Sequence, residues 1–215
     1  MQPDVNYHRG GQILQTGTPL EQAKAVMILI HGRGATADSI LSLAAEFDQP
    51  EMAFLAPHAR GNTWYPYPFI MPIAQNEPFL SSALAAIGDL VDHVVEAGVS
   101  ADKIVLLGFS QGACLALEYA IRNARRYGGV IGFSGGLIGE PGTAWDYPGT
   151  FDGTPIFLGC DERDSHIPAQ RVHESADVLG KHGANVTKRL YAGMGHTIND
   201  DELNHARVIA SGVLA

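Results

Sequence analysis

The sequence lacks a long hydrophobic run, a basic cluster and a leader-like start. Its longest apolar run, AVMILI at 25–30, is far shorter than the roughly 20 residues that cross a bilayer. The first ten residues contain no basic region followed by an apolar stretch, so we expect no secretory signal and a cytoplasmic protein. Lysine and arginine number only 14 against 23 acidic residues, and the net charge of −9 would repel nucleic acid and anionic membranes. We therefore expect no nucleic-acid partner and no stable membrane insertion.

Cysteine is also scarce. Of the two present, Cys114 lies in an Ala/Leu-rich stretch and Cys160 ends an apolar run. Neither belongs to a CxxC motif or to a Cys/His spacing typical of a zinc site. We expect both to be buried, reduced thiols, and we expect no metal site and no cofactor.

What is present is a regular alternation of short β-rich runs and longer helical patterns, over a length that suits one domain, 1–215. The predicted strands lie at 25–31, 52–57, 103–110, 129–135, 154–160 and 186–192. The predicted helices lie near 37–47, 79–97, 111–124, 168–183 and 200–213. Several strands are almost continuously apolar, which is typical of a parallel sheet covered on both faces. The sequence therefore predicts an α/β fold with a mostly parallel, doubly wound sheet flanked by helices.

Ligands in such sheets bind beyond the carboxyl ends of the strands, and candidate residues are judged here by that position. The Pro- and aromatic-rich segment 58–78 is predicted to be a long loop, a feature that is often functional. We expect no large lid domain.

The pattern Gly-x-Ser-x-Gly occurs twice, as GFSQG at 108–112 and GFSGG at 132–136. It can mark a nucleophile held on a tight turn between a strand and a helix. A predicted strand precedes each serine, but only Ser110 is followed by a helix-forming stretch, QGACLALEYAIRN. The glycines and prolines within 136–149 exclude a helix directly after Ser134. Ser110 is therefore the predicted nucleophile, and Ser134 a strand-end residue in a nearby loop.

A serine nucleophile needs a base, usually a histidine that a carboxylate holds in the correct tautomer. In enzymes built on this strand–turn–helix, the order along the chain is serine, acid, histidine, on loops after later strands. The Gly-rich turn after the last predicted strand offers His196 as the base. The segment after the strand at 154–160 offers three carboxylates: Asp161, Glu162 and Asp164. The order of the chain leaves the choice among them open.

The oxyanion that forms during acyl transfer needs two backbone N–H donors. One is expected from Gln111, the residue after the nucleophile, at the positive end of its helix. The other is expected from Arg33 in the Gly-rich turn HGRGAT, whose alternative role is a plain connection between strand and helix. His31 at the start of this turn is expected to be structural. His58 and His166 also follow predicted strands but fit the order serine, acid, histidine less well.

Together these motifs resemble those of the phospholipase/carboxylesterase family of α/β-hydrolases, which includes acyl-protein thioesterases and bacterial carboxylesterases. The resemblance extends over about 24–212 and is carried by LIHGRGAT, GFSQGACLALEYA, GFSGGL, DSHIP and YAGMGHTI. It implies an α/β-hydrolase fold with Ser110 as nucleophile and His196 as base. The family acid precedes an x-x-[Val/Ile]-Pro segment, which implies Asp164 rather than Asp161.

The resemblance implies a serine carboxylesterase that cleaves small to medium soluble esters through an acyl-enzyme. The alternatives are a thioesterase or lysophospholipase, a lactone hydrolase of the dienelactone type, or a non-catalytic ligand-binding homologue. Two segments depart from the family's eukaryotic thioesterases. Arg33-Gly34-Ala35 replaces their Leu-Gly-Asp, and RGNTWYPYPF at 60–69 differs from their acyl-channel region. Both departures count against a lipid-modified protein substrate.

Candidates for an apolar substrate pocket are aromatic and methionine side chains of the long loop and of the last turn. They are Trp64, Tyr65, Tyr67, Phe69, Met71 and Met194. The same side chains would equally serve to cover the sheet, and the sequence leaves both roles open. The Arg33 side chain is a candidate to attract a substrate carboxylate. We expect a small-molecule ester as the partner, and a monomer or homodimer.

Overall fold

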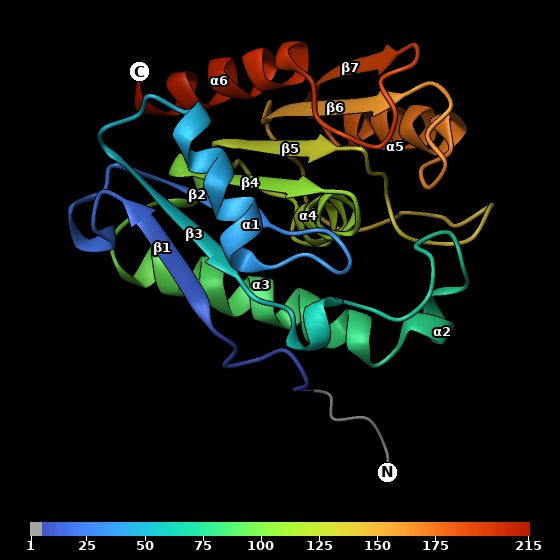
Figure 1. The fold of residues 1–215 in the computed structure, drawn as a ribbon, viewed down its shortest axis with the longest axis horizontal. Helices are drawn as coiled ribbons and strands as arrows, with labels where there is room; N and C mark the ends of the chain where they lie inside the picture. The colour runs from blue at the N-terminus through green and yellow to red at the C-terminus, as the bar shows by residue number, and fades with distance from the viewer. Residues whose placement is uncertain (1–5) are drawn as a thin grey trace.

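A computed structural model describes residues 6–215, and its centre is one seven-stranded sheet (Figure 1). The strands are β1 (Ile13–Gly17), β2 (Ala25–Ile30), β3 (Met52–Pro57), β4 (Ile104–Phe109), β5 (Gly129–Phe133), β6 (Pro155–Asp161) and β7 (Asn185–Tyr191). Their order across the sheet is β1-β3-β2-β4-β5-β6-β7. Only β1 is antiparallel to its neighbour, β3. The carboxyl ends of β4 to β7 therefore meet at one edge, where the arrowheads point in Figure 1.

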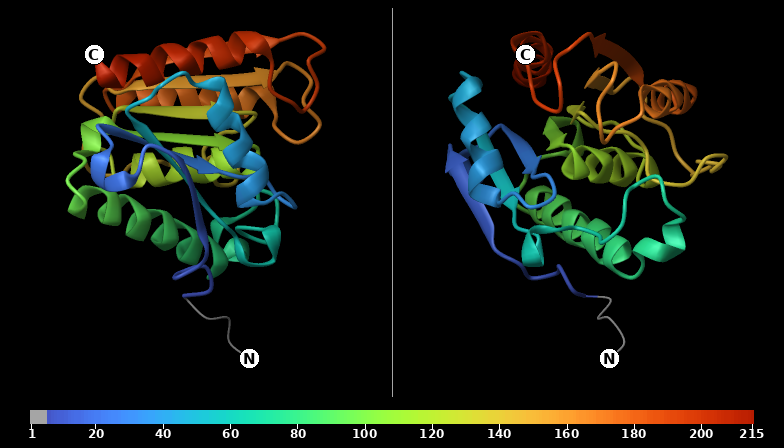
Figure 2. Two further views of the ribbon diagram at one scale, coloured as in Figure 1. Left: turned by 60° about the vertical axis from the view of Figure 1, so that its left-hand side comes forward. Right: turned by 45° about the vertical axis from the view of Figure 1, so that its right-hand side comes forward.

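Helices cover both faces of this sheet. They are α1 (Ala37–Leu41), α2 (Ile73–Asn76), α3 (Phe79–Glu96), α4 (Gln111–Arg122), α5 (Ala169–Lys181) and α6 (Asp200–Leu214). Short 3-10 turns lie at Leu20–Gln22, Ser42–Glu46, Arg60–Asn62 and Ala101–Lys103. Helices α1 and α6 lie on one face and α3, α4 and α5 on the other, as the right-hand view of Figure 2 shows.

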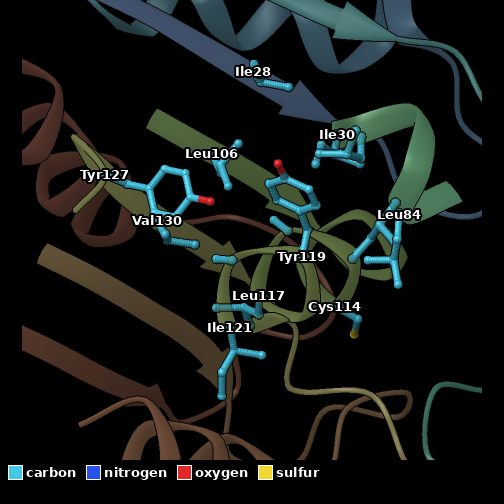
Figure 3. Packing of buried hydrophobic residues seen from close by; sticks show 14 of the residues in the cluster. Ile28, Ile30, Leu84, Leu106, Cys114, Leu117, Tyr119, Ile121, Tyr127 and Val130 are labelled. Carbon is cyan, nitrogen blue, oxygen red and sulfur yellow. The ribbon is translucent and has the colours of Figure 1, made fainter. Parts of the chain in front are cut away.

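The sheet has a hydrophobic core on each face. The continuously apolar strands contribute side chains to both cores, because successive side chains of a strand point to opposite faces. In β2, Val26, Ile28 and Ile30 join the cluster under α3, α4 and α5, whereas Met27 and Leu29 join the cluster under α1 and α6. Figure 3 shows part of the first cluster, in which Leu117, Tyr119 and Ile121 of α4 belong with the strand residues Ile28, Leu106 and Val130. The doubly wound, mostly parallel sheet predicted from the sequence is confirmed, and within residues 6–215 no insertion forms a large lid domain.

Two elements were not predicted. Strand β1 lies at the edge of the sheet, and four of its five residues are exposed, so it lacks the apolar run that marks the other strands. The predicted loop 58–78 contains the single-turn helix α2, which is too short to leave a periodic pattern.

Both cysteines are free and buried, as predicted. In the part of the chain that the structure describes, no helix is long and apolar enough to cross a membrane. Over the same residues, no group of three or more His, Cys, Asp or Glu side chains is arranged to hold a metal ion.

Candidate active site

Ser110 sits on a sharp turn between β4 and α4. Its φ of 55° and ψ of −119° lie outside the regions that L-residues normally adopt. The two flanking glycines make the turn possible. A Cβ on Gly108 would lie 2.3 Å from the carbonyl of Gly112, and a Cβ on Gly112 would lie 2.0 Å from the carbonyl oxygen of Ile30. The pattern Gly-x-Ser-x-Gly is thus required because strand, turn and helix approach each other too closely for side chains.

The turn points Ser110 at His196, which lies in the loop between β7 and α6. Ser110 Oγ is 2.8 Å from His196 Nε2, and His196 Nδ1 is 2.7 Å from Asp164 Oδ2. With a neutral imidazole, Nδ1–H donates to the carboxylate and Nε2 accepts from the serine hydroxyl. Each side chain follows a different parallel strand, and the sheet brings them together across 86 and 32 residues of sequence.

Asp164 is held as a carboxylate. Burial by itself raises the pKa of this group, but hydrogen bonds from His196 and from the amides of His166 and Ile167 outweigh it, so the pKa lies below its usual value. The two amides donate to Oδ1 over 2.8 and 3.1 Å, which leaves Oδ2 for His196. The Cys160 thiol lies 3.7 Å from Oδ2, and burial raises its pKa to about 12, so it remains a donor.

Asp161, an acid that the sequence left open, has a different place. Its Oδ2 accepts from the Gly195 amide over 2.8 Å, and its Oδ1 accepts from the Arg163 amide over 2.6 Å. These two bonds lower the pKa of the Asp161 carboxyl. Asp161 therefore ties the turn that carries His196 to the loop that carries Asp164. The sequence analysis missed this positioning role, because a bond across 34 residues leaves no local signal.

Ser134 lies in the second Gly-x-Ser-x-Gly segment and is fully buried. Its φ is also positive, at 50°, but the chain continues from β5 without a helix until after β6, as predicted. Its amide donates to the Gly159 carbonyl over 2.7 Å, and its hydroxyl has no hydrogen-bond partner among the described residues. The structure brings no histidine to Ser134 within residues 6–215.

The two predicted oxyanion donors line the same cavity as Ser110. Gln111 is the first residue of α4, so its amide has no intrahelical partner and stands at the positive end of the helix. Among the described residues, neither this amide nor that of Arg33 donates a hydrogen bond within the protein. His31 fixes the turn before Arg33: its Nδ1 bonds the Gly32 carbonyl, and its Nε2 accepts from the Ala59 amide. Burial lowers the pKa of His31, which favours this neutral, structural form.

Side chains of the two donor residues hold the long loop 58–78 over the site. The Gln111 amide group accepts from the Trp64 amide over 2.9 Å and donates to the Tyr65 carbonyl over 2.8 Å. The Arg33 guanidinium donates to the carbonyls of Pro66 and Tyr67, over 2.9 and 3.2 Å. The Arg33 side chain, a candidate to attract a substrate carboxylate, therefore also has a structural role, which is to hold this loop.

The cavity at the serine has a volume of about 540 Å³. Its lining residues come from the turn after β2, the long loop, the start of α4 and the loops after β6 and β7. They are Gly32, Arg33, Ala35, Tyr65, Pro66, Pro68, Phe69, Phe109, Ser110, Gln111, Cys114, His166, Ile167 and His196. Of the candidates for substrate binding, Tyr65 and Phe69 are in this wall.

Trp64 and Met194 are not among the residues that line this cavity. Trp64 is only 1% exposed, and its Nε1 donates to the His31 carbonyl, so its ring packs inside the fold. Met194 lies in the turn before His196, and its sulfur contacts the Asn199 side chain. Of the two histidines set aside, His166 lines the cavity with its ring 4.7 Å from that of His196, whereas the Nδ1 of His58 accepts from the first amide of α1.

Comparisons with known proteins identify the family of the chain. The family model described as Phospholipase/Carboxylesterase matches residues 12–210. An acyl-protein thioesterase 1 of Gibberella zeae is 27% identical in an alignment of 207 residues; the match covers 85% of this chain and 88% of the relative. A probable carboxylesterase of Oryza sativa is 27% identical in an alignment of 200 residues; the match covers 84% of this chain and 85% of the relative.

Among solved structures, a phospholipase/carboxylesterase from Dyadobacter fermentans superposes with a TM-score of 0.90. It is 43% identical, and the match covers 99% of this chain and all of the other. These matches show a hydrolase of the esterase and thioesterase class. The chain belongs to the phospholipase/carboxylesterase family.

Proposed function

We propose that the protein is a serine carboxylesterase that cleaves small to medium soluble esters, with Ser110, His196 and Asp164 as its catalytic triad. One observation carries the proposal: the continuous pair of hydrogen bonds, 2.8 and 2.7 Å long, that joins the strained Ser110 to His196 and Asp164. The geometry is that of a nucleophile, its base and the group that orients the base.

The reaction follows from the positions of these atoms. His196 Nε2 takes the hydroxyl proton as Ser110 Oγ bonds to the ester carbonyl carbon, and the amides of Arg33 and Gln111 stabilise the oxyanion. The carbon–oxygen bond to the alcohol then breaks, and His196 returns the proton to the departing oxygen. A water molecule, activated by His196 in the same way, hydrolyses the acyl-enzyme. Asp164 remains ionised and stabilises the imidazolium.

Size and polarity of the cavity support the substrate class. About 540 Å³ lies within the range of pockets for small ligands, and Tyr65, Phe69 and Ile167 give it an apolar wall suited to a short or medium acyl chain.

A thioester substrate is the second candidate, because the curated relatives include acyl-protein thioesterases. The same proposed triad and oxyanion donors would act whether the leaving atom is the oxygen of an ester or the sulfur of a thioester.

The test is a series of p-nitrophenyl esters from acetyl to palmitoyl, with acyl thioesters of matched chain length and Ser110→Ala as the blank. We expect the highest kcat/KM for short to medium acyl oxyesters. Higher values for thioesters throughout the series would move the assignment to a thioesterase. No hydrolysis of any member above the blank would contradict the proposal.

A further inference from the structure

A second, smaller cavity adjoins the catalytic one. Its volume is about 190 Å³, and its wall comes from the turn after β2, from α1 and the 3-10 turn behind it, and from the ends of β4 and of the His196 loop. The lining residues are His31, Gly32, Ala35, Ser39, Ile40, Leu43, Phe109 and Ile198. Gly32, Ala35 and Phe109 line both cavities, so the two are neighbours along these three residues.

The wall of this cavity offers apolar contact and no free polar side chain. Its two polar side chains are already paired within the protein. The ring nitrogens of His31 bond the Gly32 carbonyl and the Ala59 amide, and Ser39 Oγ donates to the Thr36 carbonyl and accepts from the Thr36 amide. A polar group that entered here would lose its water without gaining these partners, which is costly.

The cavity lies next to the turn that carries His196, whereas Ser110 and His196 themselves line the larger cavity. The Phe109 ring packs against the His196 ring with 5.0 Å between the centroids, and Ile198 follows His196 by two residues. In ester hydrolysis the imidazole must give its proton to the departing alcohol oxygen, so the alcohol moiety has to lie beside His196. Tyr65 and Phe69, which suit the acyl chain, line only the larger cavity.

We propose that this second cavity is the subsite for the leaving group and that it selects esters of apolar alcohols about the size of a benzyl group. The inference rests on the proposed function and extends it to the alcohol side of the substrate. The size follows from the volume, because an apolar protein cavity of about 150 Å³ accommodates benzene. Contact made here during the attack of Ser110 contributes to kcat/KM without changing the acyl chain.

The test compares three butyrates that share one acyl group: methyl, benzyl and 2,3-dihydroxypropyl butyrate. We expect the wild-type kcat/KM for the benzyl ester to exceed that for the dihydroxypropyl ester at least about tenfold, the scale of discrimination for an added apolar group in a pocket. The methyl ester, which leaves the cavity empty, should lie between them.

Leu43→Trp fills the proposed subsite from a half-buried position and should reduce the ratio of benzyl to methyl kcat/KM about tenfold. Leu43→Gln keeps the approximate size and adds an amide, and should reduce the ratio of benzyl to dihydroxypropyl ester. Val208→Trp is the matched control, because Val208 is 72% exposed on α6 and lies in neither cavity. It should leave every ratio as in the wild type.

The outcomes separate this inference from the proposed function. No preference for the benzyl ester in the wild type, or ratios unchanged by both Leu43 variants, would overturn the leaving-group subsite even with all three esters hydrolysed. A preference for the dihydroxypropyl ester would overturn it as well. Hydrolysis of the methyl ester that persists in Ser110→Ala would instead refute the proposed function on which the inference rests.

Discussion

The two Gly-Phe-Ser segments of this protein share three residues and a serine with a positive φ, but not a chemical environment. Both follow a parallel strand, and both serines have a positive φ, 55° at Ser110 and 50° at Ser134. Ser110 opens α4 and meets His196, whereas Ser134 is buried with an unpaired hydroxyl in the described structure. The phenylalanines also differ, since Phe109 lines two cavities and Phe133 is fully buried.

The comparison teaches that backbone strain at a serine does not by itself make a nucleophile. A non-glycine residue at positive φ costs on the order of 1–3 kcal/mol, and this chain carries that cost at both serines. Within residues 6–215, only Ser110 of the two serines is followed directly by a helix, which leaves the Gln111 amide without an intrahelical partner, and only Ser110 has a histidine within hydrogen-bonding distance. The predictions below test that difference.

The largest expected effect is on the serines themselves. Ser110→Ala should lower kcat/KM on p-nitrophenyl butyrate by about 10⁴-fold or more, because the attacking oxygen is removed. Ser134→Ala should change it little, because Ser134 is 0% exposed and its hydroxyl makes no hydrogen bond to Ser110, His196 or Asp164. A comparable loss in both variants would erase the distinction between the two segments.

The next effect separates the two carboxylates that serve Ser110. Asp164→Asn should lower kcat about 10⁴-fold, because the amide favours the wrong tautomer of His196. Asp161→Asn keeps one acceptor but loses one of the bonds to Gly195 and Arg163, and a small displacement of the His196 turn costs up to about a hundredfold. Steady-state kinetics at one pH would measure both. A larger loss for Asp161→Asn would exchange their assigned roles.

The third effect concerns the last glycine of each segment. A Cβ on Gly112 would meet the backbone oxygen of Ile30 at 2.0 Å, whereas a Cβ on Gly136 would meet the Arg171 side chain at 2.8 Å. Gly112→Ala should therefore cost about 3 kcal/mol or more of unfolding free energy, and Gly136→Ala about 1–2 kcal/mol, because the buried Arg171 side chain can shift in part and the strand cannot. Urea denaturation of both variants gives the two values. Equal costs would mean that the first turn is no more tightly constrained than the second.

The last effect is a pH dependence at Glu202, whose side chain packs against Gly159, the residue whose carbonyl accepts from the Ser134 amide. Glu202 is fully buried beside Gly159, with Oε2 bonded to the Asn199 amide and Oε1 unpaired in the described structure. Burial raises the pKa of Glu202 from 4.5 to about 7. The unfolded chain thus loses this proton at lower pH than the folded chain, so the free energy of unfolding should fall as pH rises from about 4.5 to 7, by up to about 3 kcal/mol.

Glu202→Gln should flatten that decline in urea denaturation series at pH 4.5 to 8. Ser134→Ala is the matched control, since it removes a neighbouring unpaired hydroxyl without a charge and should keep the slope. An undiminished slope in Glu202→Gln would place its origin elsewhere.

The proposed nucleophile and base could be singled out from the sequence because their signals are local. Ser110 was distinguished from Ser134 by the helix-forming residues that follow it, and His196 by its Gly-rich turn after a strand. Asp164 was not selected by chain order alone, because Asp161 and Glu162 occupy the same loop. In the fold, the Asp164 carboxylate faces the His196 ring and the Asp161 carboxylate faces the Gly195 amide, and this difference cannot be read from the order of the chain.

The pocket could be predicted only in part. Hydrophobicity marks Trp64 and Tyr65 equally, but neighbouring side chains of one loop point in different directions, so Trp64 packs inside and Tyr65 lines the cavity. Strand β1 was missed for a related reason: its exposed residues carry no apolar pattern, and pairing with β3 defines it.

The most direct test of the account is to react the protein with a fluorophosphonate and map the modified peptide by mass spectrometry. The account predicts one adduct, on Ser110, that is absent from Ser110→Ala and retained in Ser134→Ala. An adduct on Ser134, or a folded wild-type protein that remains unmodified, would contradict it.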